Sequence, residues 1–172
     1  MLSIGRIACI LTLMAVATAG IGQDQTRAPT PSVCEVLSNR AYYVGKEIEV
    51  RGNYIARGHD SILAGEGCWG IVDAMGRHWP SAIHIASGKG IEGQLGDIAI
   101  LQLGLRMRRE LAKRGGDVKI AKTTLTLEGT FEAVGPDARV DSEEGFGDRG
   151  YSPGQIRIIG LKDVAFELRP AE

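Results

Sequence analysis

The sequence predicts a mainly β protein whose strands close into a small five-stranded barrel. Residues 47–57 alternate apolar and polar side chains, the pattern of a strand with one buried face and one wet face. Residues 125–133 repeat this arrangement late in the chain. Each stretch has a glycine on its apolar side, Gly52 or Gly129, where a missing side chain is typical of a bend or a close backbone approach. Two long strands that bend at glycine favour a closed barrel.

The N-terminus has the features of a secretory signal. A basic region ends at Arg6, an apolar run follows, and Ala17 and Ala19 supply the small residues of a cleavage site. We therefore expect residues 1–19 to be a signal peptide and the mature protein to be periplasmic or extracellular. Cys9 is expected to be removed with the signal peptide. The alternative is a lipoprotein anchored at Cys9. No later segment approaches the roughly 20 apolar residues of a membrane span.

Signal removal leaves nineteen of the twenty basic residues and all twenty-one acidic residues. A slightly acidic balance disfavours non-specific nucleic-acid binding, which depends on neutralising phosphates. A flexible leader over residues 20–31 is expected to precede a single domain over residues 32–172, because the leader is rich in Pro, Thr and Gln and has no periodicity.

The domain begins with a short predicted helix that carries a cysteine. Ser32 and Glu35 have the spacing of a capping box, which predicts a helix ending near Asn39. Cys34 and Cys68 are the two cysteines of the mature chain, and an even number in an oxidising compartment predicts a disulfide. Two separate buried thiols are the alternative.

A longer helix is predicted between the third and fourth strands. Asp97 is the expected N-cap of a helix ending at Arg114, since Gly115 and Gly116 follow a cluster of basic residues. One apolar stripe holds Ile98, Leu101, Leu105 and Ala112, with Leu103, Met107 and Leu111 beside it. The other predicted strands cover 61–64 with 69–73 as two pieces of one strand, then 81–87, 123–134 and 155–168. Residues 118–121 are expected either to lead into the strand at 123–134 or to form a separate edge piece.

This order resembles the OB-fold, a five-stranded Greek-key barrel in which the first and fourth strands are neighbours. Several short motifs also resemble a group of uncharacterised exported bacterial proteins with an OB-like core, and that group has no established activity. The resemblance therefore implies a fold and no catalytic residue. The motifs are Val33-Cys34-Glu35-Val36-Leu37, Gly45-Lys46 leading to Val50-Arg51-Gly52, Leu127-Glu128-Gly129, and Gly145-Phe146-Gly147-Asp148-Arg149-Gly150-Tyr151-Ser152-Pro153-Gly154-Gln155.

Aromatic side chains near predicted loops indicate a binding surface, because aromatic rings stack on sugars, bases and peptide rings. We expect a non-enzymatic module that binds a protein, peptide or glycan of the cell envelope and uses no cofactor or metal. The alternative is that these rings pin loops against the barrel ends. The aromatic candidates are Tyr42, Tyr43, Tyr54, Trp69, Trp79, Phe146 and Tyr151, and the ligand-binding residues expected are Trp79, Phe146, Asp148, Arg149 and Tyr151.

Three chemical alternatives remain open. The acidic loop 141–148 offers oxygen ligands for a hard cation, or acids for a metal-dependent hydrolase that also uses a histidine. A solvated acidic loop and ordinary histidines are the simpler interpretation, because no two histidines have a zinc-site spacing. A nuclease would draw on carboxylates and arginines, here Asp73, Asp148, Arg51, Arg77 and Arg149, which follow no fixed spacing.

Overall fold

The computed structural model describes most of the chain after residue 28. The expected signal peptide and most of the leader fall outside the described residues, as do the acidic loop 141–144, Asp148 and Arg149. The described ranges are 29–57, 60–68, 71–73, 75–87, 90–115, 117–135, 145–147 and 150–171.

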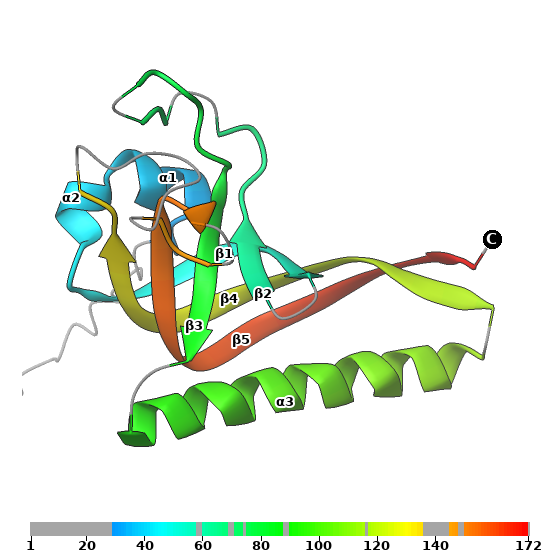
Figure 1. Cartoon of the computed structure of the whole chain (residues 1–172). Helices are drawn as coiled ribbons and strands as arrows, with labels where there is room; N and C mark the ends of the chain where they lie inside the picture. Colours follow the sequence, from blue (N-terminus) through cyan, green and yellow to red (C-terminus); the bar gives the residue numbers. More distant parts are fainter. Residues whose placement is uncertain are drawn as a thin grey trace, which may run out of the picture.

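The structure is mainly β, and its five strands are hydrogen-bonded in a closed ring in the order β1-β2-β3-β5-β4 (Figure 1). Antiparallel pairing of β1 with β4 closes the ring. The prediction that the first and fourth strands are adjacent is therefore confirmed. β3 and β5 pair in parallel, and the other pairs are antiparallel. The elements are α1 (Val33–Ser38), α2 (Arg40–Tyr43), β1 (Glu47–Arg57), β2 (Asp60–Ala64), β3 (Ala82–Ser87), α3 (Gly90–Arg114), β4 (Val118–Ala133) and β5 (Gly154–Pro170).

Both strand glycines lie where the backbone of another strand comes too close for a side chain. A Cβ atom on Gly129 would be 2.2 Å from the carbonyl oxygen of Arg157, and the β4–β5 register shifts beside Gly129. A Cβ atom on Gly52 would be 2.9 Å from the carbonyl oxygen of Ala64 in β2 and 2.7 Å from the side-chain Cγ of Leu63. Of the alternatives that a strand glycine indicates, a bend or a close backbone approach, the structure shows the close approach at both positions.

The hydrophobic core fills the ring and continues to one end of it. Alternate residues of the strands supply fully buried side chains, as the period-2 patterns predict. α1 adds Val33, Val36 and Leu37 to the same core. The fully buried side chains from the strands are Val50, Leu63, Ile83, Leu125, Leu127, Phe131, Ile156 and Ile158.

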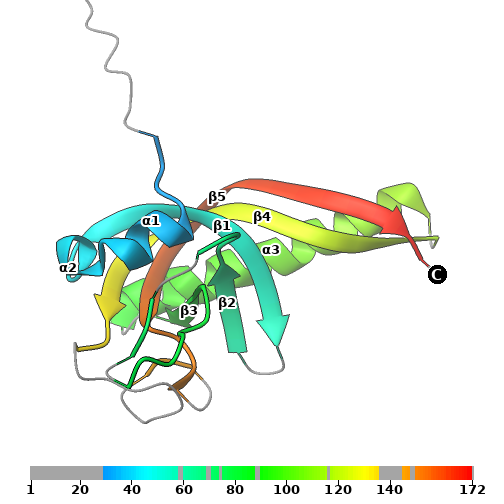
Figure 2. The ribbon, with the colours of Figure 1, turned by 90° about the horizontal axis from the view of Figure 1, so that it is seen from above.

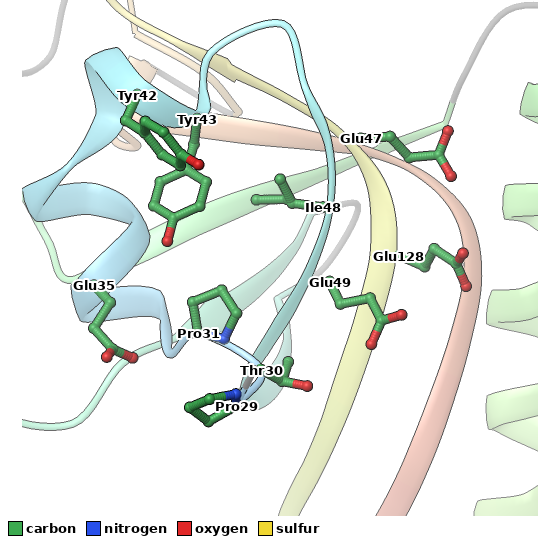
Figure 3. Close-up of a pocket in the computed structure, with 10 residues that line it drawn as sticks. All are labelled: Pro29, Thr30, Pro31, Glu35, Tyr42, Tyr43, Glu47, Ile48, Glu49 and Glu128. Atoms are coloured by element: carbon green, nitrogen blue, oxygen red, sulfur yellow. The ribbon is translucent and has the colours of Figure 1, made fainter. Parts of the chain in front are cut away.

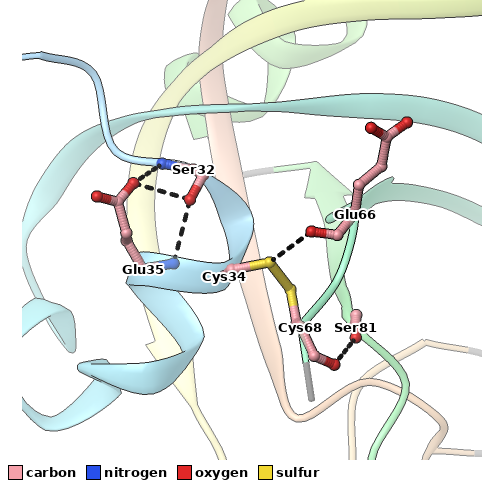
Figure 4. Close-up of a disulfide and its surroundings, with 6 residues drawn as sticks. All are labelled: Ser32, Cys34, Glu35, Glu66, Cys68 and Ser81. Carbon is pink, nitrogen blue, oxygen red and sulfur yellow. Dashed lines mark hydrogen bonds between the residues drawn. A yellow bond between two sulfur atoms is a disulfide. The ribbon is translucent and has the colours of Figure 1, made fainter.

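The capping box and the disulfide fix α1 to the ring (Figure 4). Oγ of Ser32 accepts a hydrogen bond from the backbone N–H of Glu35, and the Glu35 carboxylate accepts one from the Ser32 N–H. Cys34 and Cys68 form the predicted disulfide, with their Cα atoms 5.1 Å apart. Gly65 is required beside it, because a Cβ there would lie 2.6 Å from Sγ of Cys68.

The prediction for the second strand is only partly right. β2 ends at Ala64, and Ile71, Val72 and Asp73 belong to a loop in which Val72 forms an isolated bridge with His78. The Asp73 carboxylate accepts hydrogen bonds from the backbone N–H groups of Met75 and Arg77, so this segment closes as a polar turn. An Asp that caps a turn in this way competes with strand pairing.

The long helix α3 differs from the prediction in its start and in its buried face. It begins at Gly90 rather than Asp97, since Asp97 lies inside the helix and accepts a hydrogen bond from Oγ of Ser87. Glycines have low helix propensity, so Gly93 and Gly96 argue against a helix before Asp97. The packing of the helix against β5 nevertheless requires a glycine at position 96. A Cβ on Gly96 would be 2.6 Å from the carbonyl oxygen of Ile158 in β5.

The helix turns its Leu103 side toward the sheet, and the predicted apolar stripe faces outward. Ala99 and Leu103 are buried, and Ile100 and Met107 pack partly against the core. The side chains on the opposite face are exposed: Ile98 by 48%, Leu101 by 64% and Leu105 by 44%. No helix in the described part of the chain is long and apolar enough to cross a membrane.

β4 and β5 extend beyond the ring as a two-stranded ribbon, and α3 lies along it in both views (Figures 1 and 2). β1 pairs with β4 only from Thr124 to Thr130, whereas the β4–β5 pairing continues to Val118 and Pro170. The predicted leading stretch 118–121 is therefore part of β4.

Candidate functional site

The aromatic residues that the sequence placed on one binding surface differ in their exposure. Trp79 is buried, with 5% of its surface exposed, and its backbone N–H donates to the carbonyl of Ile71. Phe146 is partly buried and packs against the core, whereas Tyr151 is 44% exposed. Asp148 and Arg149 lie outside the described residues, so binding by these five residues stays a prediction.

Gly147 lies against His84 of β3, next to a backbone pairing between Phe146 and Ser152. Phe146 and Ser152 exchange two backbone hydrogen bonds of 3.0 Å, and Gly147 adopts a left-handed φ of +80°. A Cβ on Gly147 would be 2.9 Å from Nδ1 of His84 and 3.1 Å from Oδ2 of Asp60. The loop, β2 and β3 therefore meet at His84.

His84 is half-buried and faces a carboxylate. Its Nδ1 is 3.4 Å from Oδ1 of Asp60, but within the described chain this nitrogen makes no hydrogen bond. Burial lowers the pKa of His84 below its ordinary value, although the Asp60 charge acts in the opposite direction. No three metal-ligating side chains gather anywhere in the described ranges.

A second site is the cleft between the two short helices and β1, which we call the tyrosine cleft (Figure 3). Its volume is about 470 Å³. Four of its lining residues are glutamates, two are tyrosines, and none of the described lining residues is basic. The lining residues are Pro29, Thr30, Pro31, Glu35, Tyr42, Tyr43, Glu47, Ile48, Glu49 and Glu128.

The tyrosines come from α2, a single turn of helix that leads into β1. Their rings meet edge to face, with centroids 5.0 Å apart and an interplanar angle of 85°. Gly45, with a φ of +76°, then turns the chain, and its N–H donates to the carbonyl of Phe131 in β4. The ammonium of Lys46 lies 3.4 Å from the centroid of the Tyr42 ring, so this ring already accepts a cation on one face.

The carboxylates come from α1, β1 and β4. Glu47 and Glu49 are on the outward side of β1, and Glu128 lies opposite Glu49 on β4. The ammonium of Lys162 lies between the last two, 2.6 Å from Glu49 and 3.5 Å from Glu128. Hydrogen bonds from Ser32, chiefly from its backbone N–H, lower the pKa of Glu35 below its ordinary value. With four carboxylates against the ammonium groups of Lys46 and Lys162, the cleft has a net negative charge.

Sequence reasoning missed this cleft although it noted the parts. Tyr42 and Tyr43 were candidate aromatics, and the alternation in β1 placed Glu47 and Glu49 on the wet face. The missing element was α2, whose four residues are too few for a periodic signal.

Comparison of the chain with protein-family models, curated proteins and solved structures finds no match. Function is therefore inferred from the geometry of the sites.

Proposed function

We propose that this protein is an exported, non-enzymatic binding module built on an OB-like Greek-key barrel. The ring order and the β1–β4 pairing support the barrel. The disulfide supports export, because such bonds persist in oxidising compartments. The ligand is a protein or peptide segment of the envelope that presents a Lys or Arg side chain to the tyrosine cleft.

The observation that carries this proposal is the composition of the cleft. A Lys or Arg side chain has an apolar stem that packs on tyrosine rings and a charged end that pairs with carboxylates. Lys46 on the Tyr42 ring is an example of the first contact within the protein itself. Cation–π contacts are worth about 0.5 to 2 kcal/mol each, depending on desolvation. A glycan lacks the positive charge that this lining favours.

The test is a titration of the mature protein with a fluorescent peptide of alternating Lys and Ala, followed by anisotropy. We expect binding that weakens as salt rises, and that weakens roughly tenfold in Tyr42→Ala, because a ring contact of about 1.4 kcal/mol is lost. Tyr151→Ala is the matched control, since Tyr151 is also an exposed tyrosine but lies in the loop before β5, which does not line the tyrosine cleft. Loss of binding in the control alone would place the site at that loop, and no binding by the wild type would refute a cationic ligand.

Export has a separate test. Mass spectrometry of protein purified from the envelope should show a chain that begins near Gly20 and contains no titratable thiol. A cytoplasmic protein that retains Met1 would remove the compartment argument.

A metal-dependent hydrolase is the second candidate function, and the contact of His84 with Asp60 favours it. A carboxylate beside an imidazole is the arrangement that orients a general base or a metal ligand. The assay is hydrolysis of model ester and phosphodiester substrates with added Zn²⁺, Mn²⁺ or Mg²⁺. Activity that His84→Gln abolishes would favour the hydrolase, and inactivity with every metal would reject it for these substrates.

A further inference from the structure

The outer face of α3 carries exposed apolar side chains from Ile91 to Leu105, and in the described chain no element covers it (Figure 1). We call this face the outer stripe and define it by Ile91, Ile98, Leu101 and Leu105. These side chains are exposed by 77%, 48%, 64% and 44%, respectively. A row of large apolar side chains in water marks an interaction surface.

The outer stripe has the spacing of a coiled-coil seam. Ile91, Ile98, Leu105 and Ala112 recur every seven residues, and Leu101 lies three residues after Ile98. This is the a and d pattern that two helices use to pack along each other. The remaining d positions hold Gln94 and Arg108, polar side chains that fix register in helix pairs but interrupt a surface made for lipid. The periodicity therefore favours a helix as the occupant.

Charge along α3 favours an antiparallel copy of the same helix. The half from Gly90 to Gln102 has no Lys or Arg and includes Asp97, whereas the half after Gln102 is strongly basic. Parallel pairing would set the two basic halves side by side. Antiparallel pairing moves them to opposite ends, brings Asp97 of one copy toward the arginines of the other, and opposes the two helix dipoles. The basic residues of the second half are Arg106, Arg108, Arg109, Lys113 and Arg114.

We propose that the outer stripe is the interface of a homodimer in which two α3 helices pack antiparallel and cross near Leu101. From Ile91 to Ala112 the seam is about 32 Å long, three heptads of contact. A helix pair of this length lies near the lower end of stable protein interfaces, so dissociation in the micromolar range is expected. This inference is independent of the ligand of the tyrosine cleft, which lies on other elements.

Sedimentation velocity of the mature protein from submicromolar to submillimolar concentration tests the dimer. We expect a reversible shift from monomer to dimer, and roughly tenfold or greater weakening in Leu101→Glu, since two unpaired carboxylates would meet at the crossing. Met75→Glu is the matched control, because Met75 is 65% exposed and belongs to the turn after Asp73, not to α3. Both variants change exposed side chains, and unchanged thermal melts will verify that they fold.

Cross-linking tests the direction of the helices. With the native disulfide intact, Leu101→Cys should be joined to its own copy by a short bismaleimide. Ala112→Cys should not, because its two copies would be about 33 Å apart. Rapid cross-linking at position 112 would indicate parallel helices and overturn the proposal. A protein that stays monomeric at every concentration would also overturn the proposal, as would a dimer that Leu101→Glu does not weaken. In a separate flotation assay, a monomer that binds anionic vesicles and loses this binding in Leu101→Glu would show that the outer stripe binds lipid instead.

Discussion

At the scale of single residues, His84 is the group whose environment most directly predicts a response to pH. Burial lowers its pKa in the folded protein, so between this lowered value and the ordinary value near 6.5 the unfolded chain binds more protons. Stability is therefore fully present above about pH 6.5 and decreases as the pH falls from there toward the lowered pKa.

Thermal melts at pH 7.5 and pH 5.5 measure this effect. The wild type should lose stability on acidification, and His84→Gln should lose less, because glutamine does not titrate. His78→Gln is the control, since His78 is an exposed histidine outside the contact between β2 and β3. Equal pH slopes for wild type and His84→Gln would contradict the burial of His84. Hydrogen bonds also lower the pKa of two glutamates: Ser32 is the main donor to Glu35, and Lys122 is the main donor to Glu66. These two carboxylates affect stability only below the ordinary glutamate pKa, at lower pH than the His84 effect.

At the scale of elements, α3 offers two glycines whose replacement should have opposite effects. Gly96 is pressed against the backbone of Ile158, and a methyl group there forces the helix away from β5. Gly104 has no atom within 4 Å of an added Cβ. Gly96→Ala should cost about 1 to 3 kcal/mol of unfolding free energy by overpacking. Gly104→Ala should contribute about 0.5 to 1 kcal/mol through helix propensity. Urea denaturation measures both, and a stabilised Gly96→Ala would mean that α3 is not seated on β5.

The disulfide is the other element-scale prediction. α1 has six residues, too few to be stable alone, and the bridge from Cys34 closes a loop of 34 residues in sequence. By the chain-entropy estimate such a loop contributes about 4 kcal/mol. Reduction, or Cys34→Ser with Cys68→Ser, should lower the melting temperature accordingly. An unchanged melting temperature would show that the capping box and the three buried α1 side chains hold the helix unaided.

These elements also show how far the sequence could predict the structure. The strand alternation, the capping box and the cysteine pair are local or binary signals, and each led to the observed element. The start and face of α3 were not predictable in this way, because Gly96 belongs to the helix only through its contact with Ile158. Of two apolar stripes on one helix, periodicity cannot tell which one the sheet covers. The tyrosine cleft depends on α2 and on the β1–β4 pairing, which bring residues 42 and 128 together from distant parts of the chain.

At the scale of the whole molecule, the ring and the ribbon should differ in stability. Residues 126–130 of β4 have paired neighbours on both edges, β1 and β5, and the side chains of Leu125 and Leu127 are buried in the core. Residues 118–123 pair with β5 alone, and Lys119 and Ala121 among them are exposed. Backbone amides with few buried contacts around them exchange their hydrogens by local opening. The amides of core strands exchange only when the whole domain unfolds.

Hydrogen exchange followed by mass spectrometry can separate the two regions. A peptide covering residues 125–131 should exchange only at the rate set by global unfolding, and peptides covering 118–123 and 165–170 should exchange roughly tenfold faster or more. α3 lies along the ribbon, so the proposed dimer adds a second expectation. Raising the protein concentration through the dimer range should slow exchange in the α3 helix while the ring strands keep their rates, because pairing stabilises the helix locally. Equal protection of ring and ribbon at every concentration would mean that the two unfold as one unit and that the ribbon is as strongly held as the core.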